Sequence, residues 1–441
     1  MADTTDSAPG KPLFHLLARF VRVSPHEAPL VGVAFLLFFF VLGSYFAVRP
    51  VRETIATVLG QNRVADLWLY TASFALLIVP LYGWLVARVR RSVLLPCIYA
   101  AVALVLAIIG TLLGRHPGDH QIGAFFYVWI SVLNLMLVSV FWSFLLEVFS
   151  SEQSRRLFGF IAAGGTLGAL AGPLITRFVV GPFGNAGVLY VSTAGFLGAI
   201  ACQRVLLRLW ARTQLTLSNP ESQPAEAARP DRGLGGNPFA GIATVLKSRY
   251  LLGVALFVVL LSLVNTLLYF EQLRIVEQTF PDLTRRTEVF ANIDMLVQAL
   301  TILSQLLLTG WIATRLGVST LLTIVPVAMI CGFLLLAAFN VFGIIALALV
   351  VRRWGEYAFV RPGREMLFSR LDTEAKYKAK SFIDVPVYRL ADYAGAQAKA
   401  AIEALGTTPV VVALLGALAG TLWALNGWLL GRRYDRATSA D

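Results

Sequence analysis

The feature that most constrains this chain is a series of apolar segments, each about 20 residues long, the length of a helix that crosses a lipid bilayer. Of the 441 residues, 57% are hydrophobic and 14% are charged, which is too apolar for a soluble protein of this size. We therefore predict an all-α membrane protein with twelve transmembrane helices. The predicted segments lie near 28 to 48, 66 to 87, 92 to 113, 122 to 147, 157 to 180, 187 to 210, 250 to 272, 287 to 312, 319 to 339, 341 to 367, 378 to 404 and 408 to 430.

A polar stretch rich in Pro, Gly, Ala and Glu separates the first six segments from the last six. We expect two six-helix bundles with polar ends. The predicted parts are a cytoplasmic amphipathic segment over 1–27, the first bundle over 28–210, a cytoplasmic linker over 211–240, the second bundle over 241–430 and a cytoplasmic tail over 431–441.

The formal net charge of +12 comes from Lys and Arg residues that gather in the short loops between apolar segments. This distribution follows the positive-inside rule, so we do not expect a nucleic-acid partner. The richer loops place both termini and the linker in the cytoplasm, and no small-residue cleavage site follows a short apolar stretch near the amino terminus. We expect a monomeric, multi-pass protein of a bacterial inner membrane.

A charged stretch, Val350 to Arg370 (VVRRWGEYAFVRPGREMLFSR), follows the apolar part of the tenth segment. Charges at membrane depth are costly unless they face water or a partner, which favours a cavity lining. In a continuous helix, four of its residues share a face about 100° wide, with Arg361 at the edge. These four are Arg353, Glu356, Tyr357 and Arg364. Pro362 and Gly363 predict a bend. The alternative is that the last arginines of the stretch anchor the helix at the cytoplasmic surface.

Further charges lie in other segments. Arg49, Arg52 and Glu53 share one face of the first segment and line a cavity if its helix continues, or an outer vestibule if the helix ends at Val48. Glu271 is either a cavity carboxylate or an interface residue, and Asp294 requires a partner or water. Charges in the eleventh segment could form internal salt bridges without touching a ligand. These are Lys380, Asp384, Asp392, Lys399 and Glu403.

The two halves of the sequence look like copies of each other. Gly83-Trp84-x3-Arg88-x3-Ser92 recurs as Gly310-Trp311-x3-Arg315-x3-Ser319. A parallel repeat of six segments is the layout of the major facilitator fold, with the substrate site between the halves. The loop GWLVARVRR, Gly83 to Arg91, resembles the major facilitator loop motif. Candidate gating residues are Gly83, Arg88, Arg91, Gly310 and Arg315.

Three stretches resemble the ATP:ADP antiporter family of nucleotide translocases. They are YFAVRPVRET (Tyr45 to Thr54), FWSFLLEVFSSEQSRRLFGFIAAGG (Phe141 to Gly165) and EYAFVRPGREMLFSRLDTEAKYKAKSFID (Glu356 to Asp384). The resemblance implies that transport depends on Arg52, Glu271 and Arg364, which match a basic, an acidic and a basic position of that family. A further acidic position of the family, in the fourth segment, has no counterpart here. That region offers only Ser131, Asn134 and Ser139.

These residues predict a secondary transporter that exchanges nucleotides or related phosphorylated anions by alternating access. Guanidinium groups suit this substrate because they stay charged and bind phosphate bidentately. The glycine-rich run Gly164 to Pro173 lacks a phosphate-binding GK[ST] and suits close helix packing, and no catalytic, metal or cofactor motif is present, so we expect neither an enzyme nor a cofactor.

Two alternatives remain for the function. A proton-coupled major facilitator carrier of another organic anion would use a buried carboxylate, for which Glu53, Glu271, Asp294 and Glu356 are available. A non-transporting scaffold or sensor would leave the aligned charges unexplained. For the arginines, the alternative to substrate binding is that Arg52 and Arg364 pair with Glu53 and Glu365 to hold helices together.

Overall fold

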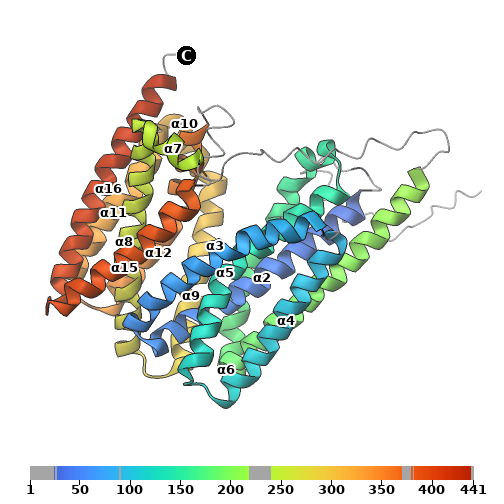
Figure 1. Ribbon diagram of the computed structural model, residues 1–441, viewed down its shortest axis with the longest axis horizontal. Coiled ribbons are helices and arrows are strands. Elements are labelled where there is room, and N and C mark those ends of the chain that lie inside the picture. The colour runs from blue at the N-terminus through green and yellow to red at the C-terminus, as the bar shows by residue number, and fades with distance from the viewer. Residues whose placement is uncertain are drawn as a thin grey trace, which may run out of the picture. The chain divides into compact units, whose positions relative to one another are not determined.

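The computed structural model describes residues 24, 27–88, 91–217, 240–369, 379–380 and 382–438, and all regular elements in these ranges are helices (Figure 1). Most of the predicted linker and of the amino-terminal segment lies outside the described residues. The helices are α2 (Ala28–Leu59), α3 (Gln61–Arg88), α4 (Arg91–Arg115), α5 (His120–Val148), α6 (Ser151–Leu217), α7 (Ala240–Lys247), α8 (Arg249–Thr279), α9 (Leu283–Leu307), α10 (Thr309–Arg315), α11 (Gly317–Ala338), α12 (Phe342–Gly355), the π-helix η1 (Glu356–Val360), α13 (Arg361–Phe368), the π-helix η2 (Ile383–Val387), α15 (Tyr388–Ala404) and α16 (Pro409–Thr438).

Within the described ranges, eight helices are long and apolar enough to cross a membrane: α2, α4, α5, α6, α8, α9, α11 and α16. The 67-residue α6 covers two of the predicted segments and is interrupted at Gly184, whose φ of 63° is a conformation that glycine adopts without strain. The other predicted segments fall on α3, on α12 with η1 and α13, and on η2 with α15. The all-α membrane fold is thus confirmed, and the number twelve stays a prediction.

Several predicted helix ends differ from the structure. The first helix does not stop at Val48, because α2 continues through Pro50 to Leu59, so the vestibule alternative that depended on an early end is wrong. The predicted span from 287 to 312 is divided at Leu308 into α9 and α10. The short α7 is additional, and α16 extends through most of the stretch predicted as a tail. Apolar composition predicts the part of a helix that lies in the lipid. It does not predict polar helical turns that extend beyond the lipid.

The chain divides into two compact units. Unit 1 comprises Met1–Arg49, Ile78–Pro117 and Val132–Ala227. Unit 2 comprises Pro50–Leu77, Gly118–Ser131 and Ala228–Asp441. Helices α2, α3 and α5 therefore each contribute one end to unit 1 and the other end to unit 2. The boundaries of the two predicted bundles stay a prediction.

Unit 1 contains a close packing of α2 against α6. The glycines Gly164, Gly168 and Gly172 lie so near the α2 backbone that an added Cβ would collide with carbonyl oxygens of Phe35, Phe39 and Gly43. The predicted packing role of these glycines is confirmed, since only the absence of a side chain permits this approach.

Glu27 lies just before α2 and ties the start of that helix to the start of α6. Its carboxylate accepts hydrogen bonds from the Ser24 amide at 3.0 Å, from Gln153 Nε2 at 2.9 Å and from Arg156 Nη2 at 2.9 Å. Burial alone would raise the pKa of Glu27, but these donors outweigh it and lower the pKa from its usual value. The carboxylate is therefore held in its charged form.

Unit 2 is built around α8, α11, α12, α15 and α16, which pack side by side (Figure 1). Its core contains large, fully buried side chains such as Phe257, Phe333 and Trp423. The ends of α2 and α3 that belong to unit 2 make polar contacts with α9 and α15. The Thr54 and Thr287 hydroxyls lie 2.7 Å apart, and Arg286 Nη1 donates to Thr57 Oγ1 at 2.8 Å. Lys399 Nζ donates to Gln61 Oε1 at 2.5 Å.

Candidate transport site

The charged stretch that begins at Val350 is called the arginine-rich stretch from here on. The π-helical turn η1 interrupts it within the tenth predicted segment. Pro362 has no N–H and cannot donate to the Ala358 carbonyl four residues earlier. Thr309 Oγ1 from α10 donates to that carbonyl at 2.8 Å instead. Gln305 Nε2 from α9 similarly donates to the Tyr357 carbonyl at 3.2 Å. The break is therefore stabilised by neighbouring helices, and π-turns of this kind occur often at functional sites.

The π-turn η1 also lies between Arg353 and Arg364 in the sequence. An ideal α-helix would place Arg353, Glu356 and Arg364 on one face, but η1 inserts a wider turn between them. Arg353 Nη1 instead pairs with Asp294 Oδ1 of α9 at 2.6 Å, and both groups are buried. Glu356 lies near enough to Arg361 and Arg364 to interact with both electrostatically, so the shared face predicted from a continuous helix stays a prediction.

Two further ion pairs hold neighbouring arginines. Arg352 Nη1 pairs with Glu356 Oε2 at 2.8 Å, one turn along the chain. Arg364 Nη2 lies 3.2 Å from Asp384 Oδ1 of η2. The alternative pairing of Arg364 with Glu365 is wrong, because Glu365 pairs with Lys380 at 2.5 Å. Charged residues of the eleventh predicted segment form salt bridges within the protein, as expected from the prediction that they need not touch a ligand.

Arg361, the first residue of α13, differs from these three arginines. Its guanidinium carbon lies 4.9 Å from the centre of the Tyr357 ring, and the residue as a whole is exposed. Of the four described arginines between Arg352 and Arg364, Arg361 alone has no carboxylate within ion-pair distance. Glu356 and Asp384 are near enough to attract it electrostatically without direct pairing. Among these four described arginines, Arg361 is therefore the one most available to an anion.

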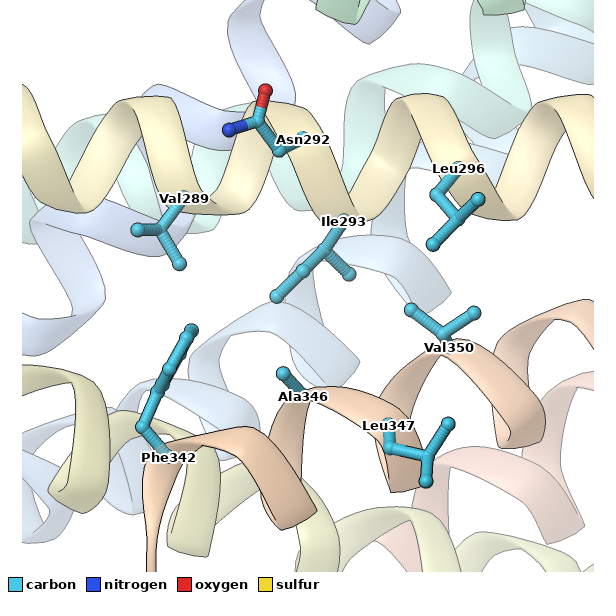
Figure 2. Close-up of a pocket in the computed structure, with 8 residues that line it drawn as sticks. All are labelled: Val289, Asn292, Ile293, Leu296, Phe342, Ala346, Leu347 and Val350. Atoms are coloured by element: carbon cyan, nitrogen blue, oxygen red, sulfur yellow. The ribbon is translucent and has the colours of Figure 1, made fainter.

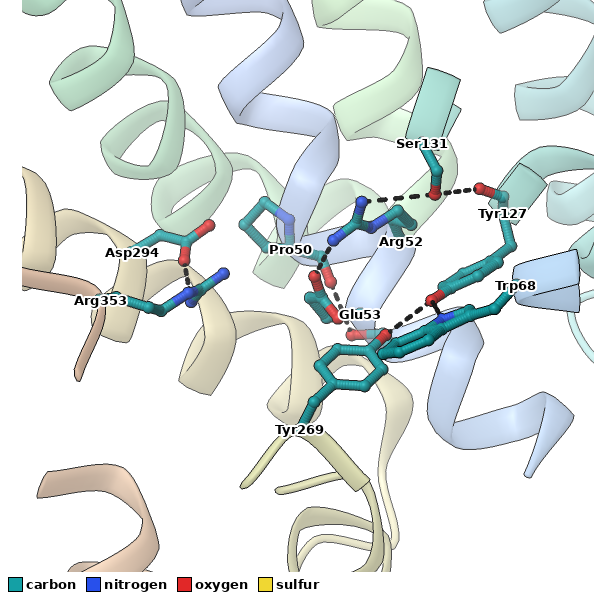
Figure 3. A network of polar contacts seen from close by, with 10 residues as sticks. Pro50, Arg52, Glu53, Trp68, Tyr127, Ser131, Tyr269, Asp294 and Arg353 are labelled. Carbon is teal, nitrogen blue, oxygen red and sulfur yellow. Dashed lines mark hydrogen bonds and ion pairs between the residues drawn. The ribbon is translucent and has the colours of Figure 1, made fainter. Parts of the chain in front are cut away.

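A second polar cluster surrounds Arg52 in the part of α2 that belongs to unit 2 (Figure 3). Arg52 pairs with Glu53, as the structural alternative expected, and its Nη1 also donates to Ser131 Oγ of α5 at 3.4 Å. Its guanidinium lies 5.7 Å from the centre of the Tyr127 ring. One residue of α5 that Arg52 contacts is thus the neutral Ser131, in the region where the resemblance to the antiporter family implies an acid.

The Arg52 cluster continues through three aromatic side chains that Figure 3 shows side by side. Trp68 Nε1 donates to the Tyr127 hydroxyl at 2.8 Å, and the hydroxyls of Tyr127 and Tyr269 lie 3.0 Å apart. Sequence reasoning missed Trp68 and Tyr127, because an aromatic residue in an apolar segment carries no signal that separates it from core packing.

The other predicted residues lie elsewhere. Arg49 lies in unit 1 with its guanidinium 5.8 Å from the Phe46 ring centre. Glu271 is buried in α8 and accepts hydrogen bonds from Arg274, whose Nη2 also donates to Asn340 Oδ1 at 3.1 Å. The described contacts do not bring Arg52, Glu271 and Arg364 together.

The predicted gating residues lie at helix ends. Gly83 belongs to α3, Arg88 ends that helix and Arg91 begins α4. Gly310 and Arg315 belong to α10 and are exposed. Their gating role stays a prediction.

An apolar groove of about 310 Å³ lies between α9 and α12. Figure 2 shows Val289, Ile293 and Leu296 facing α12 across the groove, with the Asn292 amide turned away. A groove without charged groups does not suit a polyanion, so the arginine-rich stretch and the Arg52 cluster are the better candidate sites.

Helices that are long and apolar enough to cross a membrane, with buried ion pairs between them, define a multi-pass membrane protein as the class. The sequence matches the model of the Major Facilitator Superfamily over residues 34–360. The chain belongs to this superfamily, a family of transporters, which implies that it is a carrier.

The resemblance to ATP:ADP antiporters is confirmed by two relatives. The chain is 23% identical to ADP,ATP carrier protein 1 of Chlamydia trachomatis over 455 aligned positions, which cover 87% of this chain and 84% of the relative. ADP,ATP carrier protein 1 of Chlamydia muridarum is also 23% identical, with the same coverage.

Solved structures support the fold. The nucleoside transporter NupG has a TM-score of 0.56 at 14% identity, covering 92% of this chain and 99% of that one. A bacterial homologue of the iron transporter ferroportin in the inward-facing state has a TM-score of 0.61 at 13% identity, covering 90% of this chain and 98% of that one.

Proposed function

We propose that this carrier exchanges nucleotides, or closely related phosphorylated anions, across the membrane by alternating access. The observation that carries the proposal is the availability of Arg361 beside three arginines whose charge is balanced by carboxylates. A phosphate group adds negative charge where Arg361 has no ion pair, and a guanidinium binds it through two parallel hydrogen bonds.

Two further features support a nucleotide as the substrate. The relatives are ADP,ATP carriers, and their similarity covers most of both chains. The cluster of Trp68, Tyr127 and Tyr269 offers ring faces beside Arg52, and aromatic faces stack on bases. Alternating access requires the helices of the second half of the chain, such as α9, to separate from the ends of α2 and α3 that belong to unit 2. We therefore propose that the contacts of Thr54 and Thr57 open during transport.

The proposal is tested by reconstituting the full chain in liposomes loaded with candidate anions. Uptake of labelled ATP, ADP, inorganic phosphate and sugar phosphates is measured with and without an internal anion. We expect ATP uptake that depends on internal ADP. Uptake of an uncharged or cationic solute, with no uptake of any anion, would refute the proposal.

Orientation is tested separately, and we predict that both termini face the cytoplasm of a bacterial inner membrane. A single reporter cysteine at Pro117 should react with an impermeant thiol reagent applied outside the cell, whereas one at Glu152 should not. The reverse pattern would overturn the predicted orientation.

A further inference from the structure

Asp392 of α15 is a buried carboxylate that is held differently from the others. Its Oδ1 accepts a hydrogen bond from the Ser262 hydroxyl of α8 at 2.5 Å, and the residue is 8% exposed. The nearest guanidinium nitrogen, Arg389 Nη1, is 3.9 Å from Oδ2. One turn further along α15, Gly395 packs against Thr266, so α8 and α15 approach closely at this point.

The carboxylates that were first considered for proton coupling all have a closer cationic partner. Glu53 pairs with Arg52, and the other three lie 2.5 to 2.8 Å from a guanidinium nitrogen. The remaining pairs are Glu271 with Arg274, Asp294 with Arg353, and Glu356 with Arg352. Each of these four carboxylates therefore has a cationic group in close contact. Asp392 differs, because a hydroxyl is its only close donor among the described residues.

The surroundings of Asp392 connect it to the arginine-rich stretch. Arg352 and Glu356 act on it electrostatically from α12 and η1, and Arg389 and Tyr388 act from its own helix. From α8 it meets the uncharged Ser262. Protonation of Asp392 therefore removes one negative charge that acts on Arg352 and Glu356, which belong to the same stretch as Arg361.

From this arrangement we infer that Asp392 is a proton-binding site coupled to anion binding. The proton adds to a carboxylate oxygen and the Ser262 hydroxyl remains hydrogen-bonded to the neutral acid. The positive potential at the arginine-rich stretch then rises, which strengthens the binding of a polyanion. Because coupling between two sites is reciprocal, a bound anion makes Asp392 bind its proton more tightly. The entering anion consequently carries the proton with it, and an inward proton gradient accelerates the exchange.

The proton site is tested without any assumption about the substrate. Infrared difference spectra of the full-length protein in liposomes are recorded between alkaline and mildly acidic buffer, and the carbonyl band of a protonated carboxylic acid is followed. We expect the band in the wild type and in Asp392→Glu, and its loss in Asp392→Asn. Glu403→Gln is the matched control, because Glu403 lies on the same helix but pairs with Lys399 at 2.6 Å, so the band should persist. The same band in Asp392→Asn would overturn the inference.

Ser262→Ala gives a second test that leaves the carboxylate in place. Removing a donor that stabilises the charged form should shift the midpoint of the Asp392 band to higher pH. An unchanged midpoint, in a variant that is folded and reconstituted to the wild-type level, would contradict the role of Ser262.

The coupling to an anion rests on the proposed function and is read out with ATP as the probe. ATP added at constant pH should increase the Asp392 band in the wild type. In Asp392→Asn, ATP exchange against internal ADP should persist while its acceleration by an inward proton gradient is lost. ATP exchange with wild-type acceleration in Asp392→Asn would overturn the coupling. A band that depends on Asp392 in a protein that carries no ATP would support the proton site and count only against the proposed substrate.

Discussion

The buried pair of Arg353 and Asp294 gives the sharpest prediction about stability. Their side chains are 7% and 2% exposed and their charged atoms are 2.6 Å apart. At an effective dielectric constant of about 20, this separation corresponds to an attraction of about 6 kcal/mol, which offsets the cost of removing two ions from water. Arg353→Ala removes the attraction but leaves the buried carboxylate. We therefore expect a loss of about 3 to 5 kcal/mol in the free energy of unfolding.

The exposed pair of Lys380 and Glu365 is the matched control. Its charged atoms are as close, at 2.5 Å, but the side chains are 33% and 48% exposed. Solvent screens this pair, so Glu365→Ala should cost only about 0.2 to 1 kcal/mol. Both single variants and their parent are compared by thermal and denaturant unfolding of purified protein in the same detergent.

The double change Arg353→Met with Asp294→Leu separates burial of charge from loss of packing. Two apolar side chains of similar size remove both charges, so most of the stability lost in Arg353→Ala should return. Equal losses from the buried and the exposed pair, or no recovery in the double variant, would refute the reasoning.

Other contacts give three smaller predictions. Thr309→Val should destabilise the protein by about 1 to 3 kcal/mol because the Ala358 carbonyl loses its donor, whereas Thr309→Ser should stay near wild type; equal melting temperatures for the two variants would contradict this. Asp435 accepts the first amides of α11, so Asp435→Ala should cost about 0.5 to 2 kcal/mol in the same assay, and an unchanged melting temperature would show that this cap is dispensable. Cysteines replacing Thr54 and Thr287, whose hydroxyls are 2.7 Å apart, should form a disulfide that stops uptake until it is reduced; undiminished uptake by the fully oxidised protein would show that this contact need not open.

The fold could be predicted because transmembrane helices appear in the sequence as long apolar runs. The segments around 92 to 113 and 319 to 339 contain almost nothing else, and each corresponds to a single long helix. Helices were harder to predict from runs that contain charged residues. One such segment, from 341 to 367, is divided by η1. Pro362 indicated a bend, but the turn was stabilised by Thr309, which is distant in sequence and carries no recognisable motif.

Sequence reasoning named candidate site residues, whose roles stay predictions, and identified few of their ion-pair partners. Burying Asp294 required a partner, yet only the packing of α9 against α12 identifies that partner as Arg353. Helical projection could not anticipate the π-turn at Glu356–Val360, because Thr309 and Gln305 of neighbouring helices stabilise it. Asp392 looked like one of several internal charges, and its hydrogen bond to Ser262 depends on the crossing of α8 and α15.

The central claim is that a phosphorylated anion binds where Arg361 has no ion pair, and exchange of labelled ATP against internal ADP in liposomes tests it most directly. Arg361→Ala should abolish exchange while its thermal stability stays near wild type, since no ion pair is broken. Arg361→Lys should retain part of the rate, because the charge remains but the bidentate fork is lost. Arg285→Ala, which removes an exposed arginine that pairs with Glu288, should exchange ATP normally. Wild-type exchange by a folded Arg361→Ala would contradict the account.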